Sequence, residues 1–148
     1  MAVSCTVNVA TRFLDVTSPQ IQAVVVHALS HLRKKEGSVT VHCIGEKRIQ
    51  TLNREHRGID RPTDVLSFPL QSDVSFGGES DIGDIFLAPT YIRRQARRFG
   101  VSPREETVRM TIHGVLHLLG YDHEAESEAK KMFSLQERLL REALLKVF

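Results

Sequence analysis

The sequence predicts an α+β fold, α/β-like in its first part, with a mixed sheet of about four strands and about five helices. Short runs rich in β-branched residues alternate with helical patterns, and two helical patterns then follow one another. Glycine or proline separates most of these patterns. The length of 148 residues suits one ordinary domain, so we expect a single domain over residues 1–148.

The first half of the chain predicts two strands, each followed by a helix. The expected elements are a strand over 5–9, a helix from Ser18 to Gly37, a strand over 38–44, a helix over 47–56 and a polar loop over 58–63. Ser18 and Pro19 supply an N-cap and a first-turn proline to the first helix. Its inward stripe has helical spacing and consists of Ile21, Val24, Val25, Ala28, Leu29 and Leu32.

The second half predicts two further strands and three helices. The expected elements are a strand over 64–70, a loop over 71–81, a strand over 82–88, and helices over 89–99, 102–119 and 124–148. Pro69 indicates a strand end or a sheet edge, because proline lacks the amide proton of a central strand. Ser102 and Glu105 have the spacing of a capping box, and Gly120 ends the helix that they begin.

Composition indicates an ordinary globular protein, because 41% of the residues are hydrophobic and the net charge is only +2. The N-terminal residues do not have the pattern of a signal peptide, and no apolar run is long enough for a membrane span. We therefore expect a soluble, cytoplasmic protein with no membrane partner. Cys5 and Cys43 are expected to be reduced, partly buried thiols, and the sequence leaves open whether they lie on neighbouring strands.

A basic segment occupies one predicted helix and the start of the next. Its five arginines are Arg93, Arg94, Arg97, Arg98 and Arg104. The segment fits either a solvated helix face or a patch that binds phosphate groups through bidentate guanidinium contacts. The sequence alone leaves both alternatives open.

Three histidines lie close together in the segment HGVLHLLGYDH. His113 and His117 are four residues apart on a predicted helix, so both imidazoles lie on one face and can converge on one ion. Gly120 lets the chain turn back at the helix end, so that His123 can approach the same ion. Three neutral nitrogens with one open position are typical of a catalytic zinc site. We expect this site at the end of a long central helix.

The spacing of this motif equals that of the metzincin peptidases, H-E-x-x-H-x-x-G-x-x-H. One position differs: Gly114 stands where those peptidases have the glutamate that serves as general base. Glycine cannot accept a proton from metal-bound water. A peptidase mechanism would therefore need another carboxylate, such as Asp84 or Asp122.

The segment HGVLHLLGYDH with its Gly114 resembles the signature of the YbeY family of bacterial rRNA maturation factors. Two further segments agree in order, namely LNREHRGIDRPTDVLSFP over residues 52–69 and GDIFLA over residues 83–88. The resemblance implies a zincin-like fold and a single-strand-specific endoribonuclease. It also implies a role in maturation of the 16S rRNA 3′ end and in ribosome quality control.

The resemblance further implies the site residues and partners. His113, His117 and His123 correspond to the ligands of one zinc ion, and His113 and Arg57 to catalytically important residues. The implied partners are rRNA, the small ribosomal subunit and ribosome-assembly proteins, whereas the oligomeric state is left open. Another divalent metal would also suit three histidines.

The chemistry of these residues accords with phosphodiester cleavage. We expect the ion to polarise a phosphate oxygen or to activate a water, and Arg57 to clamp the phosphate. Asp84 and Asp122 could each orient a histidine or cap a turn. Two rival functions remain: a zinc metallopeptidase-like hydrolase, and a non-catalytic ribosome-binding factor with a structural metal.

Overall fold

The computed structural model describes residues 2–12, 15–70, 81–121 and 125–148 and has the predicted α+β architecture. In chain order the elements are β1 (Val3–Val9), α1 (Ser18–His31), β2 (Gly37–Cys43), α2 (Glu46–Arg57), β3 (Val65–Pro69), β4 (Gly83–Leu87), α3 (Pro89–Phe99), α4 (Pro103–Leu118) and α5 (Glu126–Val147). Within the described ranges, four strands and five helices are therefore present, as the sequence predicts.

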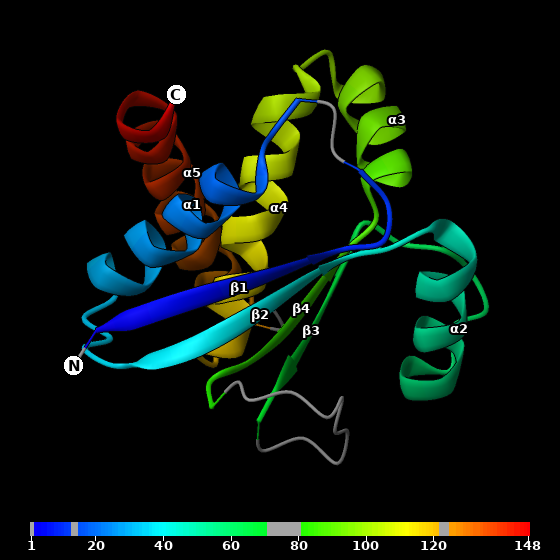
Figure 1. Ribbon diagram of the computed structural model, residues 1–148, viewed down its shortest axis with the longest axis horizontal. Coiled ribbons are helices and arrows are strands. Elements are labelled where there is room, and N and C mark those ends of the chain that lie inside the picture. Colours follow the sequence, from blue (N-terminus) through cyan, green and yellow to red (C-terminus); the bar gives the residue numbers. More distant parts are fainter. Residues whose placement is uncertain (1, 13–14, 71–80, 122–124) are drawn as a thin grey trace.

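The four strands form one mixed sheet in the order β1-β2-β4-β3 (Figure 1). β1 pairs with β2, and β2 with β4, in parallel, whereas β3 pairs with β4 in antiparallel orientation. β3 is thus an edge strand, and Pro69 is its last residue. Both alternatives that the proline suggested are therefore realised, because a missing amide proton is tolerated at such a position.

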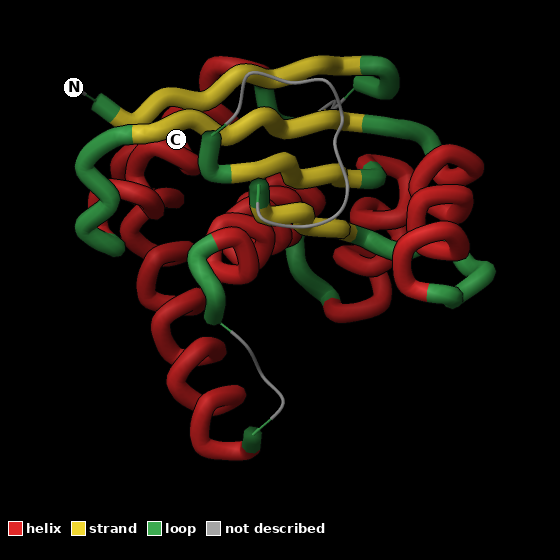
Figure 2. Tube along the Cα trace, turned by 90° about the horizontal axis from the view of Figure 1, so that it is seen from below, coloured by secondary structure: helices red, strands yellow, loops and turns green. Residues whose placement is uncertain are grey.

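The helices divide between the two faces of the sheet. α1, α4 and α5 lie together on one face (Figures 1 and 2), where Val41, Ile85 and Leu87 belong to the same buried cluster as the apolar side chains of these helices. α2 packs through Ile49 and Leu52 on the other face, against side chains of β3 and β4. Alternation along the strands explains this division, because successive side chains point to opposite faces. α2 and α4 therefore lie on opposite sides of the sheet.

The first helix differs from its predicted bounds at both ends. Its N-cap is Thr17 and not Ser18, because the Thr17 hydroxyl accepts the Gln20 amide while the Gln20 side chain accepts the Thr17 amide. The helix ends at His31 and not at Gly37, since Arg33 already has the left-handed φ of 61°. The stripe predicted to face inward is buried from Ile21 to Leu29.

The N-cap of α4 is Ser102, as predicted, and its hydroxyl accepts the Glu105 amide at 3.0 Å. The Glu105 carboxylate forms an ion pair with Arg109 one turn further along the helix, so it does not bond back to the N-cap amide. The first turn of α4 therefore has half of the predicted capping box.

The two cysteines are free thiols on the neighbouring strands β1 and β2. Cys5 lies opposite Val39 and Cys43 lies opposite Val9, so the two thiols are not directly opposed. Burial raises the pKa of both thiols from 9.0 to about 12, which keeps them protonated and unreactive at neutral pH. No helix among the described residues combines the length and apolar character that a bilayer crossing needs.

Candidate metal centre

Helix α4 lies unusually close to the sheet at Gly114. A Cβ atom added to Gly114 would lie 2.8 Å from Ile85 Cγ2 and 3.2 Å from Ser67 Oγ. The Ser67 hydroxyl also donates a hydrogen bond to the Gly114 carbonyl oxygen at 3.1 Å. The glycine that replaces the peptidase glutamate is therefore required by packing, because any side chain at this position would collide with β4.

The same helix brings His113 and His117 together. Their Nε2 atoms lie 3.0 Å apart, and their ring centroids lie 4.5 Å apart. Both side chains are half-buried. The predicted convergence of the two imidazoles on one point is thus present in the structure, and it follows from the four-residue spacing on a helix.

Helix α5 fixes the orientation of His113. The Oε1 atom of Gln136 lies 2.7 Å from His113 Nδ1, and the Gln136 amide nitrogen faces Glu137 at 3.4 Å. An amide oxygen can only accept, so the proton of the neutral imidazole is on Nδ1 and the Nε2 lone pair faces His117. This is the tautomer that a metal ligand binding through Nε2 requires.

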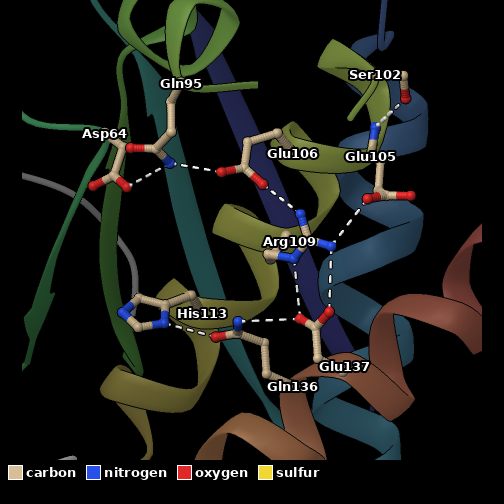
Figure 3. A network of polar contacts seen from close by, with 9 residues as sticks. All are labelled: Asp64, Gln95, Ser102, Glu105, Glu106, Arg109, His113, Gln136 and Glu137. Carbon is tan, nitrogen blue, oxygen red and sulfur yellow. Dashed lines mark hydrogen bonds and ion pairs between the residues drawn. The ribbon is translucent and has the colours of Figure 1, made fainter. Parts of the chain in front are cut away.

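Behind Gln136, a buried network of polar side chains connects α5 to α4 and to α3 (Figure 3). Arg109 bonds to the carboxylates of Glu105, Glu106 and Glu137, and Gln95 joins Glu106 to Asp64. Burial alone would lower the pKa of Arg109, but the hydrogen bonds to the three carboxylates raise it above its ordinary value. The network contains more carboxylates than guanidinium groups, so its net negative charge favours a cation near His113.

The chain reverses direction after α4 at Gly120, which has a φ of 90°. The Gly120 amide donates to the His117 carbonyl and the Tyr121 amide donates to the Leu116 carbonyl, which are the two bonds of a Schellman motif. The predicted turn is therefore present. His123 and Asp122 lie outside the described residues, so the approach of His123 to the other two histidines stays a prediction.

A surface depression of about 410 Å³ borders His117. The end of β3, the start of β4 and the turn after α4 line it, together with Lys34. The histidine pair is thus reachable from solvent at the same end of the sheet where α4 terminates.

The comparisons with known proteins agree with this geometry. Residues 6–144 match the family model described as Endoribonuclease YbeY. The chain belongs to the endoribonuclease YbeY family. The resemblance carried by the histidine motif is therefore confirmed, and with it the enzyme class, a hydrolytic endoribonuclease.

Members of the YbeY family resemble the chain over most of its length. The protein named Endoribonuclease YbeY from Persephonella marina is 39% identical over 126 residues, which are 84% of this chain and 82% of that protein. The protein of the same name from Shouchella clausii is 41% identical over 131 residues, covering 82% of each chain. The solution structure of TM1509 from Thermotoga maritima has a TM-score of 0.61 at 30% identity and covers 94% of this chain and 88% of its own.

Arg57, the arginine of the YbeY-like segment, lies in the last turn of α2 and is exposed. α2, which carries Arg57, and α4, which carries His113, cover opposite faces of the sheet, so the role of Arg57 at the histidine site stays a prediction. Asp84 does orient a histidine, but this is His42 on β2, whose Nε2 lies 2.8 Å from Asp84 Oδ1. The alternative that Asp84 caps a turn is thereby excluded, since it lies within β4.

The basic segment divides into paired and exposed arginines. Arg94 makes a bidentate ion pair with Glu46 of α2, and Arg93 lies 3.7 Å from Asp15. Arg97 and Arg98 are exposed and line a depression of about 460 Å³ on α3. Arg104 donates to the Asp15 carbonyl oxygen at 3.3 Å. Three of the five predicted arginines therefore contact neighbouring segments, and Arg97 and Arg98 face solvent.

The residues that support the histidine pair are not part of the histidine motif and were not predicted from the sequence. Gln136 stands in the inward stripe of α5 between Met132 and Leu139, and a polar residue at such a position was the available signal. Glu106 is 1% exposed and lies three residues before Arg109 on α4, which is a spacing for an ion pair. A second group that could hold a metal ion, which was not predicted from the sequence either, consists of His27, His31 and Glu142.

Proposed function

We propose that this chain is a single-strand-specific, metal-dependent endoribonuclease that acts as a single domain in the cytoplasm. Its substrate is the 3′ end of 16S rRNA, in the small ribosomal subunit, and it also serves ribosome quality control. The observation that carries the proposal is the paired Nε2 atoms of His113 and His117, 3.0 Å apart beside a depression, in a chain of the YbeY family.

The described donor atoms fit one divalent metal ion, for which zinc is the proposed identity. Gln136 holds the Nδ1 proton of His113, so the Nε2 lone pair is directed toward the point that His117 also faces. His113, His117 and His123 would hold the ion, with His123 assigned from the motif alone. A site of three histidines retains an open position, as in catalytic zinc sites.

A bound divalent ion supplies Lewis acidity and an acidified water at this position. His113 and His117 supply neutral nitrogens, and Gln136 keeps His113 in the required tautomer. Arg57 is proposed to bind a phosphate oxygen of the substrate through its guanidinium group, and its exposed position in α2 leaves that group accessible. The substrate strand would then pass around the edge strand β3.

Exposed residues outside the histidine site could bind a flexible RNA strand. Arg97 and Arg98 offer positive charge to the phosphate backbone, and Tyr121 is 38% exposed directly after α4 and offers a stacking surface. Single strands are favoured over duplexes because unstacked bases can use such a surface.

The tight packing at Gly114 disfavours the peptidase alternative. A glutamate at this position would collide with Ile85, and Asp84, one of the substitute carboxylates, is committed to His42. The alternative of a structural metal requires a fourth protein ligand. Among the described residues, the carboxylate that lines the depression beside His117 is Asp81, which is bonded to Ser38 instead.

The test compares cleavage of defined single-stranded and duplex RNAs by wild type, His113→Ala and Arg57→Ala, with metal content measured for each protein. We expect His113→Ala to lose bound zinc and activity. Arg57→Ala should lose about 100- to 1000-fold in cleavage with zinc unchanged, as when a charge-stabilising donor is removed. Arg54→Ala is the matched control, because Arg54 is also exposed on α2 and pairs with Asp60 at 3.7 Å.

Three outcomes would contradict the proposal. Equal cleavage by Arg57→Ala and wild type would remove the role of Arg57. Zinc-dependent cleavage of an unstructured protein without cleavage of RNA would favour the peptidase. Unfolding of the chain on treatment with a chelator would indicate a structural metal, because a catalytic site predicts a folded but inactive protein.

A further inference from the structure

A second pair of histidines lies outside the site described above, on helix α1. His27 and His31 are four residues apart, and their ring centroids lie 4.6 Å apart. Both face Glu142 on α5, whose Oε1 lies 3.6 Å from His27 Nε2 and 3.2 Å from His31 Nε2. The three ligand atoms all lie within 4.8 Å of one another.

Two of these atoms are buried without a hydrogen bond. The His27 side chain is 9% exposed, and His27 Nε2 and Glu142 Oε1 make no hydrogen bond of good geometry among the described residues, although they face each other at 3.6 Å and Glu142 Oε1 lies 3.2 Å from His31 Nε2. A buried imidazole nitrogen and a buried carboxylate oxygen are costly to leave in this state. A cation bound between these two atoms would satisfy both, because an imidazole lone pair and a carboxylate oxygen are metal ligands.

Two of the three ligand distances, those from Glu142, match the dimensions of a metal site, and the two histidine nitrogens lie within 4.8 Å of each other. Zinc binds imidazole nitrogen and carboxylate oxygen at about 2.0–2.2 Å, so neighbouring ligands of a tetrahedral ion lie roughly 3.3–3.5 Å apart. The two distances from Glu142 Oε1, 3.2 and 3.6 Å, bracket that range. Two histidines with one carboxylate are a common ligand set for zinc and for other first-row divalent metals.

The surroundings of His27 favour its neutral form over its charged form. Burial lowers the pKa of His27, and the charges of His31 and Lys146 lower it further, whereas Glu142 acts in the opposite direction. A neutral imidazole is the form that binds a metal ion. The Lys146 charge opposes a cation here, whereas the Glu142 carboxylate, 3.6 Å from His27 Nε2, supplies negative charge and a ligand oxygen.

We propose that His27, His31 and Glu142 bind one divalent transition-metal ion of the zinc class, which fastens α5 to α1. The site is accessible, because the His31 and Glu142 side chains are 35% and 33% exposed. Gln136, which orients His113, lies six residues before Glu142 on α5, about 9 Å along the helix axis. The ion therefore stabilises the helix that supports the first histidine pair, without belonging to that pair.

The test measures metal stoichiometry and location in the full chain. Four metal-free proteins are titrated with Zn²⁺: wild type, His117→Gln, and the double variants that combine His117→Gln with Glu142→Gln or with His31→Gln. The same proteins are titrated with Co²⁺, whose paramagnetism broadens the NMR signals of nearby residues. We expect the His117→Gln protein to bind one equivalent, with broadening confined to α1 and the C-terminal half of α5. Either second substitution should abolish that equivalent and the accompanying rise in melting temperature.

Matched substitutions control for nonspecific effects. Glu128→Gln changes an exposed carboxylate on the same helix, and His56→Gln changes an exposed histidine on α2, so both should leave the equivalent in place. The proposal is overturned if Glu142→Gln and His31→Gln bind as much metal as their parent while remaining folded by circular dichroism. His31 is partly exposed, so His31→Gln serves if Glu142→Gln does not fold. RNA cleavage by Glu142→Gln reports separately on the proposed nuclease function.

Discussion

The two histidine pairs of this chain have the same spacing but different surroundings. His27 and His31 on α1, and His113 and His117 on α4, have ring centroids 4.6 and 4.5 Å apart, because four residues make about one helical turn. Both pairs face α5, which presents the amide oxygen of Gln136 to one pair and a carboxylate, that of Glu142, to the other.

The partner on α5 decides which nitrogen remains available. Gln136 binds Nδ1 of His113, so that its Nε2 faces His117 Nε2 at 3.0 Å. Glu142 instead faces the Nε2 atoms themselves and so becomes a third potential ligand. Spacing on a helix therefore brings two imidazoles together, whereas the contact from a neighbouring helix determines what the pair can do.

The first way to break this comparison is to remove the amide at position 136. Gln136→Leu should lower zinc affinity at the α4 pair, and RNA cleavage, by about 10- to 100-fold, because His113 loses the group that fixes its tautomer. Zinc competition titrations and cleavage rates measure the two effects. Gln136→Glu keeps an acceptor for Nδ1 and should retain most of the affinity, whereas equal loss in both variants would indicate a merely structural role.

A second, smaller effect concerns the residue after the first histidine of each pair, which is Gly114 in α4 and Ala28 in α1. Gly114→Ala should lower the free energy of unfolding by about 1–3 kcal/mol, because the added Cβ would collide with Ile85. Ala28→Gly should cost only about 0.5–1 kcal/mol from backbone entropy, plus a small packing loss. Chemical denaturation measures both values.

A double-mutant cycle tests the cause of that loss. In an Ile85→Ala background the methyl group of Gly114→Ala has space, so the substitution should cost less there than in the wild type. Stabilisation by Gly114→Ala in the wild type would contradict the close approach of α4 to β4, because alanine would then act only through its higher helix propensity.

The smallest effect is a pH dependence that distinguishes the α1 pair. Burial lowers the folded-state pKa of His27 below the ordinary value of 6.5, and the charges of His31 and Lys146 lower it further. The charge of Glu142 acts in the opposite direction. As pH falls below 6.5, the unfolded chain binds a proton that the folded chain does not yet bind. Stability is therefore present above that pH and is lost as pH decreases toward the folded-state pKa.

Urea unfolding of the metal-free protein between pH 7.5 and 5.5 measures this dependence. The wild type should lose stability more steeply than His27→Gln, by a difference of less than one proton in the slope. Identical slopes in the two proteins would show that His27 titrates alike in the folded and unfolded chains.

The sequence predicted the elements well because their signals are local. β-Branched runs, Pro69 and the Ser102 N-cap each act within a few residues, and the structure confirms them. The position of β4 between β2 and β3 was not predictable in the same way, since it depends on pairing between distant segments. The displaced N-cap at Thr17 shows the same limit at small scale, because two neighbouring residues could both cap the helix.

In the candidate sites, too, the local features were predictable and the contacts between distant segments were not. The convergence of His113 and His117 follows from helical geometry, and the reversal at Gly120 from the freedom of glycine. The contacts of Gln136 and Glu142 with the histidines could not be predicted, because these residues meet the histidines only when α5 packs on α4 and α1. In the stripe pattern of α5, Gln136 has the position of a core residue.

The close contact at Gly114 also has an evolutionary consequence. A descendant of this chain could not acquire the glutamate of a metallopeptidase by one substitution, because Ile85 on β4 occupies the space beside that position. A smaller residue would first have to arise at position 85, at a cost in stability before any new activity repaid it. The close approach of one helix to one strand thus makes two substitutions, at positions 85 and 114, dependent on each other.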